Sequence, residues 1–310
     1  MSVVVRRPGL FTTVQDTGRW GYQQFGMPVA GAMDMFSYRL GNYLVGNKPP
    51  LASLEITLAG PELDFQENCV CAITGAEFEV YVDDVEIGLN SRFAVRSGQH
   101  LRFGRLRFGA RAYLSISGGF DVPLVLGSHS THVMTGIGGM NGRVLRAGDL
   151  LEIGRRRDRL LPRVKSATPR VKLPQGGSAV RVIEGPHLET IELTSAKTFV
   201  QSRYRITKNS DRMGYRLTGE PIAALGNEAV VSAAVPVGSV QVPPDGLPIV
   251  LMADHQTTGG YPRIATIISA DLPVVAQLKV SDWIDFEFCE RSEAIAELVA
   301  QERALMAVGD

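Results

Sequence analysis

Residues 110–117 read ARAYLSIS, a run in which small or apolar side chains alternate with polar ones. The alanines, the leucine and the isoleucine would face one side of a strand, and the residues between them would face the other. Because successive side chains of a strand point to opposite faces, this period of two predicts a β-strand with one face in the core. The run therefore favours a sheet as the framework of the chain.

The same alternation recurs in SLEITL (53–58), FEVYV (78–82) and WIDFEF (283–288). In YVDDVEIG (81–88), Asp83-Asp84 lies between two short runs and predicts a hairpin turn. Strands with turn signals between them are typical of antiparallel sheets closed into sandwiches or barrels. We therefore expect a mainly β fold (β-rich α+β), with two β-barrel or sandwich domains and few helices.

Three segments have helical spacing of apolar residues. The first is MDMFSYRLGNYLVGN (33–47), with Asp34 in its first turn, where a negative charge favours the helix dipole. The second is HLETIELTSAKTF (187–199). The third is SEAIAELVAQERALMA (292–307), for which Ser292 is the expected N-cap.

The clearest domain boundary is GRRRDRLLPRVKSATPRVKLPQGGS (154–178), with eight Lys or Arg against one Asp, three prolines and a Gly-Gly pair. A site for RNA or another anionic partner is an alternative, but no aromatic residues interleave with the basic ones to stack on bases. We read the segment as an exposed linker. The predicted organisation is a β-rich domain at 1–153, the linker at 154–178, a β-barrel domain at 179–290 and a C-terminal helix at 291–310.

Composition limits the classes of partner. The chain has 310 residues, and its 32 Lys and Arg balance 32 Asp and Glu, so its formal net charge is zero. No global positive field is present to hold nucleic acid. No stretch approaches the roughly 20 apolar residues of a membrane span, and the first apolar run is too short for a signal peptide. We therefore expect a cytoplasmic protein that binds neither nucleic acid nor a membrane.

Cysteine and histidine spacing gives little support to a metal site. Cys69 and Cys71 would point to one face of a strand, and Cys289 is the third cysteine. An odd count without a spaced framework favours reduced thiols in the cytosol. No zinc-like partner accompanies the cysteine pair, and no third ligand accompanies His129 and His132, so we expect no metal.

The first polar stretch, TTVQDTGRWGYQQFGMPVAGAMD (12–34), is a candidate site. Gln15, Asp16 and Arg19 bring an acceptor, a carboxylate and a forked cation to one short loop. The alternative is a structural Asp–Arg bridge. A long polar loop in a compact domain is more often functional.

The second stretch is GSHSTHVMTGIGGMNGRVLRAGD (127–149). Ser128, Ser130 and Thr131 precede the Gly138-Gly139 pair, where consecutive backbone N–H groups can form an anion-binding nest.

The third stretch, SDRMGYRL (210–217), holds two arginines that would share a helical face or flank a turn at Gly214. Arg212 and Arg216 suit a carboxylate or a phosphate. The alternative is an ion pair with Asp211 or a remote acid.

The fourth stretch, DHQTTGGYPR (254–263), follows a buried strand. Its polar groups crowd a strand end, and Gly259-Gly260 lets a backbone approach closely. His255 would act as a general base or point to solvent.

Nucleotide and hydrolase motifs of the P-loop, G-x-S-x-G and H-E-x-x-H types are missing, so these residues do not by themselves name a reaction. Seven motifs taken together resemble one family along nearly the whole chain: QDTGRWGYQQFGMPVAGAMD, LVGN, LEITLAGP, GSHSTHVMTGIGGMNGR, SDRMGYRL, QVPPDGLPIVLMAD and QTTGGYPRIATII. The sequence is similar to the family of the 5-oxoprolinase C subunit, also known as allophanate hydrolase subunit 2-like. That family includes part of the carboxyltransferase domain of biotin-dependent urea carboxylase and an antagonist of a sporulation-kinase inhibitor.

The resemblance implies a cyclophilin-like β-barrel in the C-terminal part. It also implies one component of an enzyme, inactive alone, that opens 5-oxoproline (pyroglutamate) to L-glutamate with ATP and with homologues of the A and B subunits. ATP would be bound by, or shared with, a partner protein. Two alternatives are a carboxyltransferase component working with biotin, and a regulatory protein that antagonises a kinase inhibitor.

The residues that we assign to the site lie in the motif cores. The expected catalytic residues are Asp16, Gln256, Thr257 and Thr258. The expected substrate-binding residues are Gln15, Arg19, Ser128, Thr131, Arg212, Tyr215, Gly259, Gly260 and Tyr261.

Overall fold

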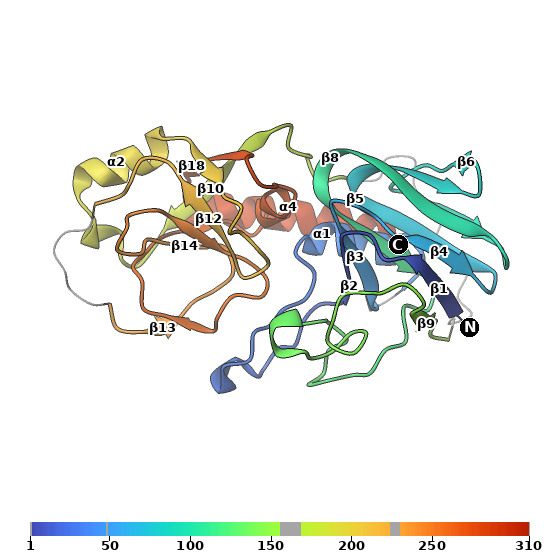
Figure 1. Cartoon of the computed structure of the whole chain (residues 1–310). Coiled ribbons are helices and arrows are strands. Elements are labelled where there is room, and N and C mark those ends of the chain that lie inside the picture. The colour runs from blue at the N-terminus through green and yellow to red at the C-terminus, as the bar shows by residue number, and fades with distance from the viewer. Residues whose placement is uncertain (1, 48, 156–168, 224–229, 310) are drawn as a thin grey trace. The chain divides into compact units, whose positions relative to one another are not determined.

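The computed structural model describes residues 2–47, 49–155, 169–223 and 230–309. In this part the chain is mainly β with four α-helices (Figure 1), which confirms the expected fold class. The predicted linker falls largely on residues 156–168, outside the described residues.

The chain divides into two compact units. Unit 1 consists of Met1–Trp20, Ala30–Leu173 and Glu302–Asp310, and unit 2 of Gly21–Val29 and Pro174–Gln301.

Unit 1 is built on one antiparallel sheet of nine strands. They are β1 (Ser2–Arg7), β2 (Phe11–Gln15), β3 (Ser53–Thr57), β4 (Glu62–Phe65), β5 (Cys69–Val82), β6 (Val85–Glu86), β7 (Arg92–Val95), β8 (His100–Ile116) and β9 (Leu150–Glu152). The order is β2-β3-β8-β4-β1-β9, and β5 pairs with β6, β7 and β8. Register shifts between β5 and β8 mark bulges, which bend these two longest strands. The predicted turn at Asp83-Asp84 joins β5 to β6.

The two faces of this sheet differ in chemistry. Leu54, Ile56 and Leu114 point into the main apolar core, as the alternation predicts. Glu55 and Tyr113 point to the other face and are also fully buried. Helix α1 (Met35–Leu44) lies against β3, β5 and β8 and covers that polar face. The polar half of the alternation therefore faces a second interior and not solvent.

Hydrogen bonds hold α1 on the polar face. Thr74 Oγ1 donates to the Ser37 carbonyl oxygen at 2.6 Å. A Cβ at Gly41 would lie 2.7 Å from Ser115 Oγ, so a glycine is needed where the helix approaches the sheet. Asp34 is the N-cap and not a first-turn residue, and its carboxylate accepts from Ser37 N at 2.9 Å.

The last helix, α4 (Arg291–Gly309), contributes to both units. Its start corrects one prediction, because the helix begins at Arg291 and Ser292 lies inside its first turn. Near its end, Leu305 and Val308 join the apolar cluster of α1 within unit 1.

Unit 2 is a closed seven-stranded barrel. Its strands are β10 (Gly177–Glu184), β11 (Tyr204–Ile206), β12 (Gly214–Thr218), β14 (Ser239–Gln241), β15 (Ile249–Leu251), β17 (Arg263–Ile267) and β18 (Trp283–Phe288). The order is β10-β17-β14-β15-β12-β11-β18, and a parallel pairing of β10 with β18 closes the barrel. Closure leaves no open sheet edge. Ile284 and Phe286 are buried as the alternation predicts, and Phe286 stacks on Phe199 at 4.5 Å between ring centroids.

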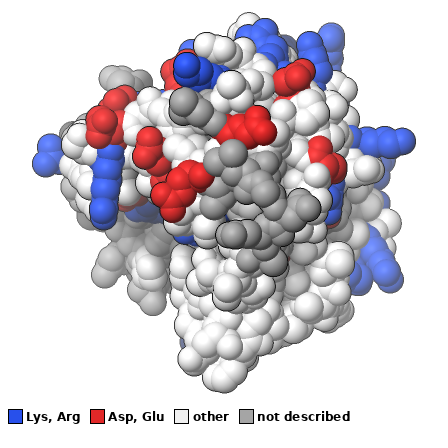
Figure 2. All heavy atoms as spheres, turned by 90° about the vertical axis from the view of Figure 1, so that its left-hand side faces the viewer, with Lys and Arg blue, Asp and Glu red and all other residues white. Residues whose placement is uncertain are grey.

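Smaller elements complete the chain. They are the two-stranded sheet of β13 (Ala233–Ala234) and β16 (Thr258–Gly259), the helices α2 (Leu193–Gln201) and α3 (Leu272–Ala276), and the 3-10 turns η1 (Gln23–Phe25), η2 (Val133–Thr135) and η3 (Leu188–Thr190). Among the described residues, no helix is long and apolar enough to cross a membrane. Figure 2 shows basic and acidic side chains interspersed over part of one face, with an uncharged area below them.

Candidate functional site

Asp16 is the centre of a buried hydrogen-bond network in unit 1. Its Oδ1 accepts from Ser128 Oγ at 2.6 Å, Ser130 Oγ at 2.5 Å and Gly18 N at 2.8 Å. Its Oδ2 accepts from His129 N at 2.6 Å. Three of the four donors crowd onto Oδ1 and one binds Oδ2, so both oxygens are engaged with the surrounding loop. This geometry favours a positioning role for Asp16 over direct chemistry.

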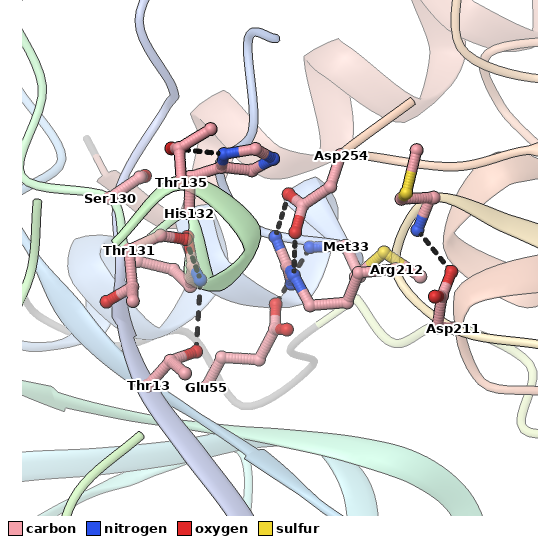
Figure 3. Close-up of polar contacts among 12 residues, drawn as sticks. Thr13, Met33, Glu55, Ser130, Thr131, His132, Thr135, Asp211, Arg212 and Asp254 are labelled. Atoms are coloured by element: carbon pink, nitrogen blue, oxygen red, sulfur yellow. Dashed lines mark hydrogen bonds and ion pairs between the residues drawn. The ribbon is translucent and has the colours of Figure 1, made fainter. Parts of the chain in front are cut away.

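Gln15 and Thr131 continue the network. The backbone N and the Oγ1 of Thr131 both donate to the Val14 carbonyl oxygen at 2.9 Å. Gln15 Nε2 donates to Thr131 O at 3.1 Å and to Thr13 Oγ1 at 3.0 Å (Thr13 and Thr131 are labelled in Figure 3). The loop of Thr131 is thereby tied to β2.

The glycine pair fits this network closely. A Cβ at Gly138, where φ is +72°, would lie 2.1 Å from Ser130 O, and a Cβ at Gly139 would lie 1.9 Å from Thr131 Oγ1. The buried Arg19 donates from Nη2 to the same Ser130 carbonyl oxygen. The turn thus packs against the loop that Asp16 holds.

A second buried cluster in unit 1 was missed by sequence reasoning. Tyr113 Oη donates to Glu55 Oε2 at 2.7 Å and accepts from Asp34 N at 2.8 Å. Glu55 Oε2 also accepts from Met33 N at 2.8 Å (Figure 3). Burial, and then the charges of Glu55 and Asp34, raise the pKa of Tyr113 well above its ordinary value, so the phenol stays protonated. The signal was a glutamate inside an otherwise strand-like run, which alternation alone assigns to solvent.

In unit 2, Arg212 forms a buried ion pair with a remote acid. Its Nε lies 2.9 Å from Asp254 Oδ2 and its Nη2 lies 2.9 Å from Oδ1 (Figure 3). The two residues are 7% and 4% exposed. Asp211 instead accepts from Met213 N at 2.8 Å. Arg216 lies exposed on β12, so of the two arrangements expected for the arginines, the shared helical face does not occur.

His255 follows this ion pair and is 9% exposed, so it does not point into solvent. Its Nδ1 lies 2.6 Å from the Gln256 carbonyl oxygen. A carbonyl only accepts, so Nδ1 carries the proton and Nε2 is the acceptor atom of the neutral ring. Burial lowers the pKa of this imidazole, which favours the neutral form.

We expect an NMR titration to place the pKa of His255 below its ordinary value of 6.5. The unfolded chain then binds the proton more readily than the folded chain. The contribution of the neutral ring to stability is therefore fully present above about pH 6.5 and is lost as the pH falls below this value through the lower pKa of the folded state. Denaturant unfolding at pH 7.5 and pH 5.5 checks this against His255→Asn, which keeps a donor near Nδ1 but does not titrate. The variant is expected to lose less stability between the two pH values. If His255→Asn lost as much stability between the two pH values as the parent does, the lowered pKa of His255 would be contradicted.

The rest of this loop is held partly by Gln241 on β14. Gln256 Nε2 lies 3.4 Å from Gln241 Oε1, and Gln241 Nε2 lies 3.4 Å from Tyr261 O. A Cβ at Gly259 would lie 2.6 Å from Gln241 Nε2, so the glycine admits this glutamine.

Of the two threonines in the loop, Thr257 is half-buried and Thr258 is exposed. Thr258 is exposed on β16, opposite Ala234, and Thr257 O accepts from Val235 N at 3.2 Å. Gly260 and Tyr261 are also exposed. Tyr215 stands apart from the loop, because it is buried in the barrel and its Oη donates to Leu278 O at 3.3 Å.

The described residues hold no group of three or more His, Cys, Asp and Glu placed to bind a metal. His129 Nδ1 lies 2.7 Å from Val122 O, and His132 Nδ1 lies 2.7 Å from Thr135 Oγ1 (Figure 3), so these two rings have separate partners.

Comparison with known proteins gives consistent matches. Residues 25–288 match the profile described as "Carboxyltransferase domain, subdomain A and B". The chain is 40% identical over 297 residues to the C subunit of 5-oxoprolinase from Escherichia coli (strain K12), covering 96% of this chain and 94% of that protein. It is 39% identical over 282 residues to the C subunit of 5-oxoprolinase from Haemophilus influenzae (Rd), covering 91% and 89%. The crystal structure of urea amidolyase of K. lactis superposes with a TM-score of 0.92 at 31% identity. That match covers 98% of this chain, which spans 20% of that enzyme.

Proposed function

The chain belongs to the family of carboxyltransferase domains with subdomains A and B, and from this premise we propose that it is one subunit of an ATP-dependent 5-oxoprolinase that opens 5-oxoproline to L-glutamate. Family membership confirms the resemblance inferred from the sequence. The observation that carries the proposal is the extent of the match. Both 5-oxoprolinase proteins align over most of their own length and of this chain, whereas urea amidolyase is five times longer than the aligned part.

The phosphates of ATP do not fit the turn at Gly138-Gly139, for which the sequence predicted an anion-binding nest. The hydroxyls of Ser128 and Ser130 donate to Asp16, the hydroxyl of Thr131 donates to Val14 O, and Gly139 N donates to His129 O. These donors are committed within the protein, so we assign no step through ATP to this turn. We propose that homologues of the A and B subunits complete the enzyme and supply the nucleotide site.

In this reading unit 1 positions groups for the substrate. Asp16 acts on the loop of Ser128 and Thr131 and not on the reacting atoms. Arg19 supports the same loop through Ser130 O.

Unit 2 offers the more accessible polar groups. We propose that Gln256, Thr257 and Thr258, with the glycines and Tyr261 that follow, contact the substrate or a partner protein. Arg212 contributes through its rigid pairing with Asp254. Tyr215 supports the barrel behind them.

A second candidate function is carboxyl transfer in a urea carboxylase-like system that uses biotin. The TM-score of 0.92 to urea amidolyase over 98% of the chain favours it. It would need a biotinylated protein and a biotin carboxylase as partners. Either function suits a protein of the cytoplasm.

An omission experiment tests the main proposal. The chain and homologues of the A and B subunits are purified and mixed with ATP, and phosphate release is followed with and without 5-oxoproline. We expect 5-oxoproline-dependent release only when all three proteins are present. Full activity of the isolated chain would contradict the proposal that it works only as part of a larger enzyme.

A further inference from the structure

Arg263, the first residue of β17, differs from four other buried or half-buried arginines of the fold. Arg39, Arg143, Arg181 and Arg212 each lie 2.6–2.9 Å from a carboxylate oxygen. Arg263 is also half-buried, but in the part of the chain that the structure describes no Asp or Glu forms an ion pair with it. Its charge is therefore without a counter-charge.

The guanidinium of Arg263 has a buried side and an accessible side. Nε is buried and has no hydrogen-bond partner among the described residues. Nη1 lies 3.5 Å from the Ala234 carbonyl oxygen, a long and exposed contact. Nη2 makes no hydrogen bond within the described residues and is not one of their buried unpaired atoms, so it reaches the surface. A cation partly withdrawn from water is costly without an anion, and here an anion can reach it.

This guanidinium lies beside the loop proposed to contact the substrate, within unit 2. Ala234, whose carbonyl it approaches, pairs with Thr258 between β13 and β16. The cross-strand neighbour of Arg263 on β14 is Gln241, and Gln241 Oε1 lies 3.4 Å from Gln256 Nε2. Arg263 therefore places a positive charge next to Gln256 and Thr258.

The neighbouring titratable residues do not neutralise this charge. Glu184 on β10 lies opposite Ala265, is exposed, and forms no ion pair with Arg263. His187 Nδ1 accepts from Arg263 N at 3.1 Å, so this ring nitrogen carries no proton and the imidazole is neutral. An accessible guanidinium with free N–H groups is suited to a carboxylate or a phosphate.

We propose that the guanidinium of Arg263 binds the carboxylate of the 5-oxoproline substrate. This inference rests on the proposed function. The substrate has a single negative charge, on its carboxylate, and the lactam ring has none, so one unpaired cation matches it. The phosphates of ATP carry several charges and are bound elsewhere by Mg²⁺ together with several donors, which a single arginine does not supply.

The test compares two ligands of nearly the same shape on the assembled complex of this chain with homologues of the A and B subunits, without ATP. One is 5-oxoproline and the other is 5-oxoprolinamide, in which a neutral carboxamide replaces the carboxylate. We expect calorimetry to show that the wild-type complex binds the amide at least about tenfold more weakly, because hydrogen bonds between two charged groups are the strong ones.

The variant Arg263→Gln keeps a hydrogen-bond donor and removes the charge. We expect it to bind both ligands with affinities within about threefold of each other, because only 5-oxoproline loses an ionic contact. Arg263→Lys is the matched control, which keeps the charge and is expected to keep part of the wild-type gap. Arg263→Met, an apolar side chain of similar length, makes the same prediction as Arg263→Gln and replaces it if Arg263→Gln does not fold.

The outcomes separate the inference from the function on which it rests. A purely structural role of Arg263 would weaken both ligands equally and keep the gap. Equal binding of the two ligands by the wild type, or a tenfold gap that survives in a folded neutral variant, would overturn the inference and leave the proposed function standing. Weaker ATP binding by Arg263→Gln with an unchanged gap would overturn it in favour of a phosphate. Neither binding nor turnover of 5-oxoproline by the wild-type complex would overturn the proposed function and the inference together.

Discussion

Replacing Arg212 with alanine is expected to lower the free energy of unfolding by about 3–5 kcal/mol. The loss arises because the carboxylate of Asp254 remains buried. Asp254 is 4% exposed and receives two hydrogen bonds from the guanidinium, so the variant leaves a carboxylate buried without its cation. Denaturant unfolding of the isolated chain, followed through the barrel of unit 2, measures the loss.

The double variant Arg212→Met, Asp254→Leu is the matched control. It removes both charges and keeps side chains of similar volume, so it is expected to recover a large part of the stability. It is still expected to reduce turnover of the assembled enzyme if the pair orders the loop that follows Asp254. If the free energy of unfolding of Arg212→Ala lies within about 0.5 kcal/mol of that of the parent, Arg212 and Asp254 do not form a buried ion pair.

Replacing Asp16 with alanine is expected to cost at least about 3 kcal/mol, since hydrogen bonds to a charged group contribute about 1.5–3 kcal/mol each and are not additive. Four donors lose their acceptor, including the hydroxyls of Ser128 and Ser130 and the backbone N–H of His129. We expect amide hydrogen exchange across residues 128–131 to accelerate together with the loss of stability.

Asp16→Asn separates the two roles considered for this residue. One amide oxygen can still accept at the Oδ1 position, but the NH₂ group cannot accept from His129 N. A positioning role predicts an intermediate stability and a turnover that falls in proportion to loop order. A folded Asp16→Asn protein with native exchange rates and abolished turnover would instead indicate direct chemistry at Asp16.

Strand periodicity predicted the β framework because it follows from backbone geometry. The main core of unit 1 contains Ala112, Leu114 and Ile116 of ARAYLSIS and Leu54 and Ile56 of SLEITL. Their polar residues could not be assigned from sequence, because a polar face covered by a helix and one covered by water have the same alternation. Glu55 and Tyr113 were missed for this reason.

The sequence also could not identify the partners of charged residues. The sequence left Arg212 with Asp211 or with an unidentified remote acid, and the structure pairs it with Asp254, which is 42 residues away in the sequence. Long-range pairing depends on strand order, here β12 beside β15, and no single motif contains that information. The same holds for Asp16, whose partners at 128–130 come from a loop more than 100 residues away.

The central claim is that this chain is part of an enzyme that opens a lactam. The most direct test is to follow ¹³C-labelled 5-oxoproline by NMR in a mixture of ATP, the chain and homologues of the A and B subunits. The account predicts labelled glutamate in the complete mixture and none when this chain is left out. No glutamate in the complete mixture, with bicarbonate-dependent ATP use and carboxylated product when a biotin carboxylase and a biotinylated carrier are supplied, would contradict it in favour of carboxyl transfer.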